Sequence, residues 1–277
     1  MKRQNTKNWL WGSLALVIAT AVFIVPFAFI FVTAAKDQQD SMLLQFSLPK
    51  HWQIWQNVID VVQANHFMLP RAFFNSIMLT VFSVTVLVIL ASMTAYIIDR
   101  RPGKLSKVAN TMLMAGLMIP PAVVPTIFIM QFFHVYGTFP GMVLIEVAYN
   151  SAFTVMIFRA FISTIPRELD EAAIIDGAGP IRLYFNVIFP LLKSVTVTAI
   201  ILNSVNVFND FTQPLYFLNG PGAETVQLTL FNFTSQYNSS YNLMFRDILL
   251  VTVPMVIMFA FFNKRIVAGM TAGAVKG

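Results

Sequence analysis

Six segments of this sequence are long and apolar enough to cross a lipid bilayer as helices, and this limits the possible folds more than any other feature. They lie at about residues 10–33, 74–98, 109–133, 141–163, 195–218 and 247–266. A helix needs about 20 residues to span a hydrocarbon core of about 30 Å. Because 57% of the 277 residues are hydrophobic, the chain lacks the polar groups to cover its own surface. We therefore predict an all-α polytopic membrane protein with six transmembrane helices.

The first apolar segment has two interpretations. Residues 10–32 contain no charged residue, and they follow Lys2, Arg3 and Lys7. A signal peptide has an apolar region of only about 7–15 residues, so the length of this segment favours an uncleaved membrane anchor. The small residues at 32–35 leave a cleavable signal peptide as the alternative. Residues 49–66, with Trp52 and Trp55 on an apolar face, predict an external helix lying at the membrane interface.

Lys and Arg are divided unevenly between the connecting segments. With the N-terminus inside, 14 of the 18 lie inside, and only Lys36, Lys50, Arg71 and Arg246 lie outside. The positive-inside rule then places both termini and the segment 164–193 in the cytoplasm. The net charge of +6 reflects this orientation and attraction to anionic lipid, so it does not require a nucleic-acid partner.

Several chemistries have no counterpart in the sequence. The chain contains no Cys, which excludes disulfides, iron–sulfur clusters and thiolate zinc sites. It contains no G-x-x-x-x-G-K-[ST] phosphate-binding loop, and its three His residues are scattered without the spacing of a metal site. We expect no catalytic residue, no metal and no bound cofactor in this chain.

The segment 164–193 is unusually acidic for this chain. Pro166 suits the first turn of a helix, and the acidic residues between 168 and 171 favour its positive N-terminal end. Gly177 predicts a left-handed stop and Pro180 the start of a second short helix. An ordinary capped surface helix is the plain alternative on these grounds.

The spacing within this segment resembles that of a known family. Glu171-Ala172-Ala173 is followed by three residues, Gly177, nine residues, Val187, one residue and Phe189-Pro190. Permeases of binding-protein-dependent ABC importers carry an EAA loop that reads E-A-A, three residues, G, nine residues, I, one residue, L-P. The stretch at 206–218 and the tail "RIVAGMTAGAVKG" look like the carbohydrate-uptake branch, close to the smaller permease subunit of the maltose transporter family.

The resemblance implies a type I ABC importer permease fold with cytoplasmic coupling helices, in a multi-pass protein of the bacterial plasma membrane. It implies two parts of the chain. Residues 1–70 form a membrane anchor and an external interfacial helix, and residues 71–277 form the permease domain, which contains the EAA loop at 164–193. The implied partners are a second, homologous permease subunit in a heterodimer, two copies of a cytoplasmic ATPase that carries ATP and Mg²⁺, and an extracellular solute-binding protein. The residues implied in coupling to the ATPase are Glu171, Ala172, Ala173, Asp176, Gly177 and Pro190.

Polar residues within the apolar segments are candidates for a translocation pathway, because such groups are costly facing lipid. On a continuous fifth helix, one stripe would hold Asn203, Asn206, Asn209, Asp210 and Gln213. The fourth segment carries Glu146, Tyr149, Asn150 and Phe153 at helical spacing. Hydrogen bonding between helices is the alternative for the first stripe, and a solvated position at the mouth is the alternative for Glu146.

The external segment 219–246 is long, polar and aromatic. The resemblance implies that it contacts the solute-binding protein, with candidate residues Gly220, Glu224, Thr225 and Gln227; a disordered connector is the alternative. The main functional prediction is a non-catalytic permease subunit of an ATP-driven sugar importer. A permease for another solute is the second reading. A secondary carrier is a third, although no clear internal repeat supports it.

Overall fold

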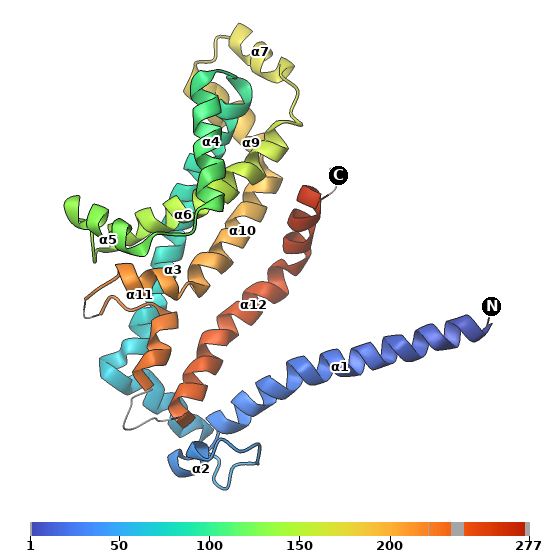
Figure 1. Cartoon of the computed structure of the whole chain (residues 1–277), viewed down its shortest axis with the longest axis vertical. Helices are drawn as coiled ribbons and strands as arrows, with labels where there is room; N and C mark the ends of the chain where they lie inside the picture. The colour runs from blue at the N-terminus through green and yellow to red at the C-terminus, as the bar shows by residue number, and fades with distance from the viewer. Residues whose placement is uncertain (1, 221, 234–240, 275–277) are drawn as a thin grey trace. The chain divides into compact units, whose positions relative to one another are not determined.

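Every regular element in the described part of the chain is a helix, which confirms the all-α prediction for those residues (Figure 1). The computed structural model describes residues 2–220, 222–233 and 241–274, without the side chains of 2–11, 14, 232–233, 255, 258–259 and 262–274. The α-helices are α1 (Lys2–Ala34), α2 (Gln38–Met42), α3 (Ile54–Arg100), α4 (Lys104–Met118), α5 (Val123–Phe132), α6 (Phe139–Ile162), α7 (Glu168–Ile175), α8 (Pro180–Arg182), α9 (Phe189–Leu191), α10 (Lys193–Asn209), α11 (Thr212–Phe217) and α12 (Tyr241–Ala274). A π-helix, η1 (Leu183–Ile188), and a 3₁₀-helix, η2 (Val226–Phe233), complete the set.

The chain divides into two compact units. The first unit contains residues 1–70 and 229–254, and the second contains 71–228 and 255–277. Helix α3 is interrupted at Ala64–Phe67, where three consecutive residues have positive φ. Its helical part after this interruption runs to Arg100 and supplies the first long helix of the second unit.

In the first unit, polar side chains satisfy the carbonyl groups at the end of α1, which a helix leaves without internal partners. Asn57 Nδ2 donates to the carbonyls of Ala34 and Lys36, both at 2.9 Å. Arg246 donates to Ala34 O at 2.8 Å. Lys36 is fully buried and its ammonium donates to Gln45 O at 2.8 Å. Lys36, which the charge distribution placed outside the membrane, is therefore a buried structural residue and not a free surface charge.

The core of the second unit is built around α6, which contacts α4, α10 and α11. Phe158 and Ile162 of α6 are fully buried, and Leu87 of α3 is nearly so. The same core continues into the 164–193 segment through Ile188 and Ala173. This segment is therefore packed into the unit and is not a loose connection between helices.

Two of the expected spans are broken helices. Pro120 and Pro121 lie between α4 and α5, and proline disrupts a helix interior. The continuous fifth helix predicted at 195–218 is wrong, because α10 ends at Asn209 and Asp210 is extended, with φ −68° and ψ 123°. The Asp210 carboxylate accepts from the backbone N–H groups of Thr212 at 2.8 Å and Gln213 at 3.1 Å. A short acidic side chain that bonds nearby backbone competes with helix continuation, and here it starts α11.

Among the described residues, three helices are long and apolar enough to cross a membrane: Ala15–Ala34, Ile54–Arg100 and Phe139–Ile162. A fourth is obtained if Pro180–Leu191 and Lys193–Asn209, which meet at 79°, are taken as one bent span. These findings show a multi-pass helical protein. The count of six spans and the cytoplasmic location of both termini remain predictions.

Candidate functional site

The short helix α7 and the turn that follows it form the first candidate site. The helix begins at Glu168 after Arg167, so Pro166 precedes it and does not occupy its first turn, contrary to the prediction. Gly177 has φ +78°, as predicted, and its N–H donates to Ile174 O at 3.0 Å. The next N–H, of Ala178, donates to Ala173 O at 2.9 Å. Glycine suits this left-handed position because it has no Cβ, and the chain turns there toward Pro180.

Helix α7 has an exposed face and a buried face. Glu171, Ala172 and Asp176 are exposed, as is Pro190 beyond η1. Asp170 and Ala173 are buried, at 8% and 9% exposure. The exposed face offers a carboxylate beside a small alanine, an arrangement that allows a partner to approach closely and to form a charge-assisted hydrogen bond.

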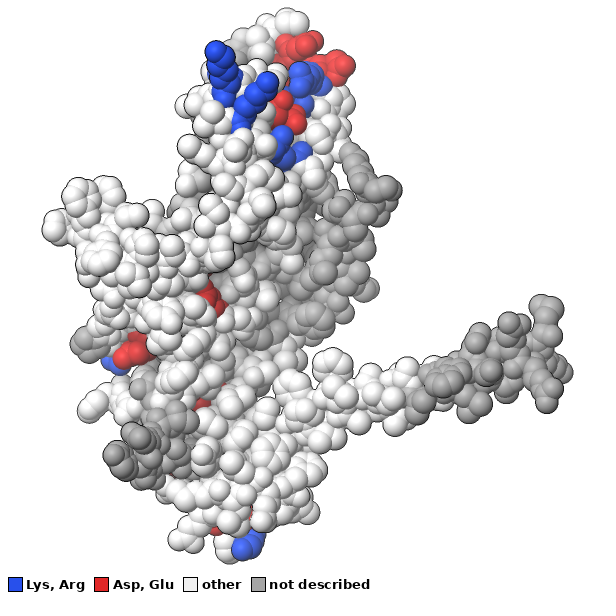
Figure 2. Space-filling view, in the orientation of Figure 1, with Lys and Arg blue, Asp and Glu red and all other residues white. Residues whose placement is uncertain are grey.

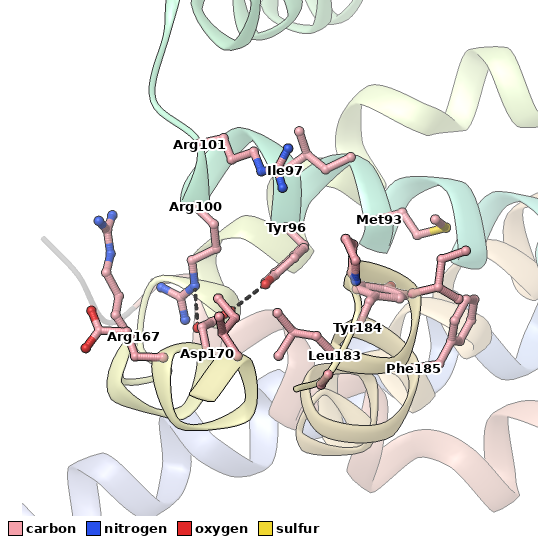
Figure 3. A pocket seen from close by; sticks show the side chains of 15 residues that line it. Met93, Tyr96, Ile97, Arg100, Arg101, Arg167, Asp170, Leu183, Tyr184 and Phe185 are labelled. Carbon is pink, nitrogen blue, oxygen red and sulfur yellow. Dashed lines mark hydrogen bonds and ion pairs between the residues drawn. The ribbon is translucent and has the colours of Figure 1, made fainter. Parts of the chain in front are cut away.

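The buried face of α7 is fixed to the last turns of α3 (Figure 3). Asp170 accepts a hydrogen bond of 2.5 Å from the Tyr96 hydroxyl and lies 3.2 Å from Arg100 Nε. Arg100 also donates to Ile165 O at 2.8 Å. These roles of Asp170, Tyr96 and Arg100 were not predicted from the sequence. A local sequence pattern cannot indicate these contacts, because Tyr96 and Asp170 are 74 positions apart.

A cavity of about 650 Å³ lies between the end of α3, α7 and η1 (Figure 3). Met93, Ile97 and Phe185 contribute apolar walls, and the exposed Arg101 and Arg167 contribute cations. Figure 2 shows blue and red side chains gathered at the end of the second unit that carries α7. This end is therefore the polar, charged end of that unit.

A second, polar cavity of about 470 Å³ lies where α6, α10 and α11 meet. Seven of the nine predicted pathway residues line it: Glu146, Tyr149, Asn150, Asn206, Asn209, Asp210 and Gln213. The other two do not. Phe153 is exposed elsewhere on α6, and the buried Asn203 donates to Thr154 Oγ1 at 3.1 Å. Asn203 thus joins α10 to α6, which is the alternative role considered for the fifth-segment stripe.

The polar cavity presents hydrogen-bond acceptors. Asn206 donates to Asn150 Oδ1 at 2.6 Å, and Asn150 donates to Glu146 O at 2.8 Å and to Glu146 Oε2 at 3.2 Å. Glu146 is only 1% exposed, so the alternative of a solvated residue at the mouth is wrong. Within the described part of the chain, Glu146 Oε1 and Gln213 Oε1 are buried without a hydrogen-bond partner. A solute rich in hydroxyl donors would satisfy Gln213 Oε1, whereas the Glu146 carboxyl group already interacts with that of Asp210.

Residues 222–226 of the 219–246 segment are folded against the start of the second unit's first helix. Asn75 Nδ2 donates to the carbonyls of Gly222 at 2.8 Å and Glu224 at 3.0 Å. Glu224 lies 3.8 Å from Arg71. Thr225 is buried, at 3% exposure. A disordered connector is therefore wrong for 222–228, while residues 221 and 234–240 lie outside the described chain.

The other two candidate contacts for a solute-binding protein in this segment differ in exposure. Gly220 is exposed, and Gln227 is half-buried and donates to Asn209 Oδ1 at 3.2 Å, beside the polar cavity. No group of three or more His, Asp or Glu side chains among the described residues is placed to hold a metal ion.

The second unit is helical, with a polar cavity among its helices and a short acidic helix at its charged end. The chain belongs to the family of binding-protein-dependent transport system inner membrane components, whose profile matches residues 87–271. It is a membrane-embedded, multi-pass protein, and the predicted resemblance to permeases of binding-protein-dependent importers is confirmed.

Relatives match over the full length. The chain is 31% identical to a probable starch degradation products transport system permease protein, AmyC, of Thermoanaerobacterium thermosulfurigenes, with 100% of both chains covered. It is 32% identical to the melibiose/raffinose/stachyose import permease protein MelC of Bacillus subtilis, again with 100% of both covered. Among solved structures, a chain of a bacterial ABC transporter involved in the import of alginate superimposes with a TM-score of 0.81. That match covers 95% of this chain and 97% of the other at 17% identity, so it supports the fold alone.

Proposed function

We propose that this chain is the transmembrane permease subunit of an ATP-driven importer and forms part of the translocation pathway for a sugar or oligosaccharide. An extracellular solute-binding protein delivers the solute. The observation that carries the proposal is the full-length similarity to AmyC and MelC, both described as permeases of saccharide transport systems. The acceptor-rich polar cavity supports it, because sugar hydroxyls donate hydrogen bonds and their C–H faces suit the Tyr149 ring that lines the same cavity.

The exposed face of α7 is the contact for the ATPase. Glu171 and Ala172 lie on the exposed face of α7, Asp176 caps its end before Gly177, and Pro190 lies beyond η1. Ala173 faces the core and supports the helix from within. A rigid helix joined to the core transmits the closure of a soluble ATPase dimer into the membrane. In this proposal the chain itself is non-catalytic, and ATP and Mg²⁺ belong to two ATPase copies.

The wider architecture completes the proposal. The six apolar segments are the spans, and the charge distribution places both termini in the cytoplasm. A second, homologous permease subunit encloses the pathway from the other side. The 219–228 segment carries Gly220, Glu224 and Gln227 at or near the surface, and these are the contacts offered to the binding protein. Thr225 supports this segment from within.

The test is a purification of the chain with its permease partner, the ATPase and the binding protein in lipid vesicles. Raffinose, trehalose and maltotriose, each with the binding protein, are compared with methionine as stimulators of ATP hydrolysis and as solutes taken up. Stimulation and uptake with at least one saccharide, dependent on ATP, are expected. Stimulation by methionine alone would favour the non-sugar permease, and uptake driven by an ion gradient without ATP would favour a secondary carrier.

A further inference from the structure

Three side chains of α3 form a polar row that receives the 164–193 segment. Ser92, Tyr96 and Arg100 are spaced by four residues, which places them on one face of the helix. Tyr96 and Arg100 hold Asp170, as described above, and Ser92 Oγ accepts a hydrogen bond of 2.6 Å from the Tyr184 hydroxyl in η1. The row therefore bonds both helical parts of the segment, on either side of Gly177.

These contacts are protected from water. The side chains of Arg100 and Asp170 are 9% and 11% exposed, and the Tyr184–Ser92 bond is buried. Arg100 also pairs with Asp99 at 3.3 Å, so loss of Asp170 leaves Arg100 with one carboxylate partner. Loss of Arg100 leaves the buried Asp170 without its cationic partner, which is strongly destabilising. The row thus resists separation of α7 from α3 more than a surface salt bridge would.

The opposite end of the same helical stretch holds a different segment. From Arg71 to Arg100 the helix is uninterrupted, which corresponds to about 45 Å at 1.5 Å per residue. At its start, Asn75 bonds the carbonyls of Gly222 and Glu224, and Ser76 Oγ accepts from Val226 N–H at 2.8 Å. One continuous helix therefore bonds the ATPase-facing segment at one end and the segment offered to the binding protein at the other.

We propose that α3 links the ATPase to the binding protein, and that the Tyr96–Arg100–Asp170 cluster is the positioning contact through which a displacement of α7 moves α3. This inference rests on the proposed function, in which the exposed face of α7 contacts the ATPase. Asp170 acts through Arg100 and Tyr96 and not by touching solute or nucleotide. Its loss should leave the ATPase bound and active but unresponsive to the loaded binding protein.

The experiment uses the reconstituted complex and compares Asp170→Asn with Glu168→Gln. Both changes remove one negative charge from the first turn of α7, but Glu168 is exposed, and no ion pair is seen for it among the described residues. Each complex is measured for retained ATPase, basal hydrolysis, and the ratio of hydrolysis with and without saccharide-loaded binding protein. For Asp170→Asn we expect retained ATPase and a stimulation ratio lowered about three- to tenfold. Glu168→Gln should match the wild type.

A charge exchange tests the pair directly. Arg100→Asp and Asp170→Arg should each lose stimulation, and the double exchange should recover part of it because the pair is restored in reverse. If the Asp170 variants fail to accumulate in the membrane, Tyr96→Phe tests the proposal instead, because it removes only one hydroxyl group. A lowered stimulation ratio with retained ATPase supports the proposal, and an unchanged stimulation ratio overturns it.

The outcomes separate the two proposals. A normal stimulation ratio in Asp170→Asn overturns the role of the cluster, and so does loss of the ATPase from that variant, because Asp170 would then be a docking residue. If the wild-type chain neither retains an ATPase nor responds to any loaded binding protein, the proposed function itself is wrong.

Discussion

Gly177 shows how one residue sets the direction of a functional segment. Its φ of +78° is a conformation that other residues rarely adopt, and a Cβ built at this position meets no atom within 4 Å. Any penalty for a larger residue therefore comes from the backbone and not from a clash. The direction of the chain from α7 toward η1 depends on this one dihedral angle.

A valine at position 177 should misdirect that turn. We expect Gly177→Val to cost about 1–2 kcal/mol, because left-handed backbone is unfavourable for residues with a Cβ. The expected result is a lower stimulated ATPase activity and lower uptake in the reconstituted complex. Gly177→Asn is the matched control, since Asn tolerates positive φ better than other residues, and it should retain most of both activities. Equal activity of the two variants would contradict a role for the turn.

Two neighbouring acidic residues, Glu171 and Asp170, show which roles the sequence could predict and which it could not. Glu171 could be assigned from its place in the EAA pattern, and Gly177 from the need for a left-handed stop. Asp170 could not, because its buried environment is made by Tyr96 and Arg100, which are distant in sequence. The burial of Glu146 was likewise invisible, since it depends on how α10 and α11 pack against α6.

At the scale of elements, the broken fifth span brings the polar cavity together. Because α10 ends at Asn209, Asp210 and Gln213 reach the cavity from a turn and a new helix. The break at Pro120 and Pro121 has a local signal in the sequence, because proline disrupts a helix interior. The break at Asp210 also has a local signal, because Pro214 follows four residues later in the first turn of α11, and the prediction of a continuous helix over 195–218 did not use it.

Two substitutions at Asp210 distinguish the role of its charge from the role of its hydrogen bonds to the start of α11. Asp210→Ala removes the acceptor for the Thr212 and Gln213 N–H groups and should cost about 1 kcal/mol. Asp210→Asn keeps an acceptor at the same place. We expect faster hydrogen exchange at Thr212 and Gln213 and reduced uptake for the alanine variant, with a smaller effect for asparagine. If asparagine impairs uptake as much as alanine, then the charge and not the cap is required.

At the scale of the whole molecule, the distribution of Lys and Arg predicts the topology. The absence of Cys in the chain makes single introduced cysteines unambiguous probes. In intact cells, a membrane-impermeant maleimide should label Gln53→Cys, while Lys104→Cys and Asp176→Cys should react only after permeabilisation. These three native residues are exposed, so burial would not mask the result. Labelling of Lys104→Cys in intact cells would contradict the predicted orientation.

The central claim is that the acidic helix α7 couples this chain to an ATPase. Its most direct test measures saccharide-stimulated ATP hydrolysis and uptake in the reconstituted complex carrying Glu171→Lys. Glu168→Lys is the control, because it makes the same change of charge on the same helix. Glu171→Lys should repel the basic group of the ATPase that the native carboxylate attracts. We expect it either to detach the ATPase or to leave hydrolysis unresponsive to loaded binding protein, while membrane insertion and binding-protein docking stay unchanged. Wild-type stimulation together with wild-type uptake in Glu171→Lys would contradict the account, because α7 would then be only a solvated surface helix.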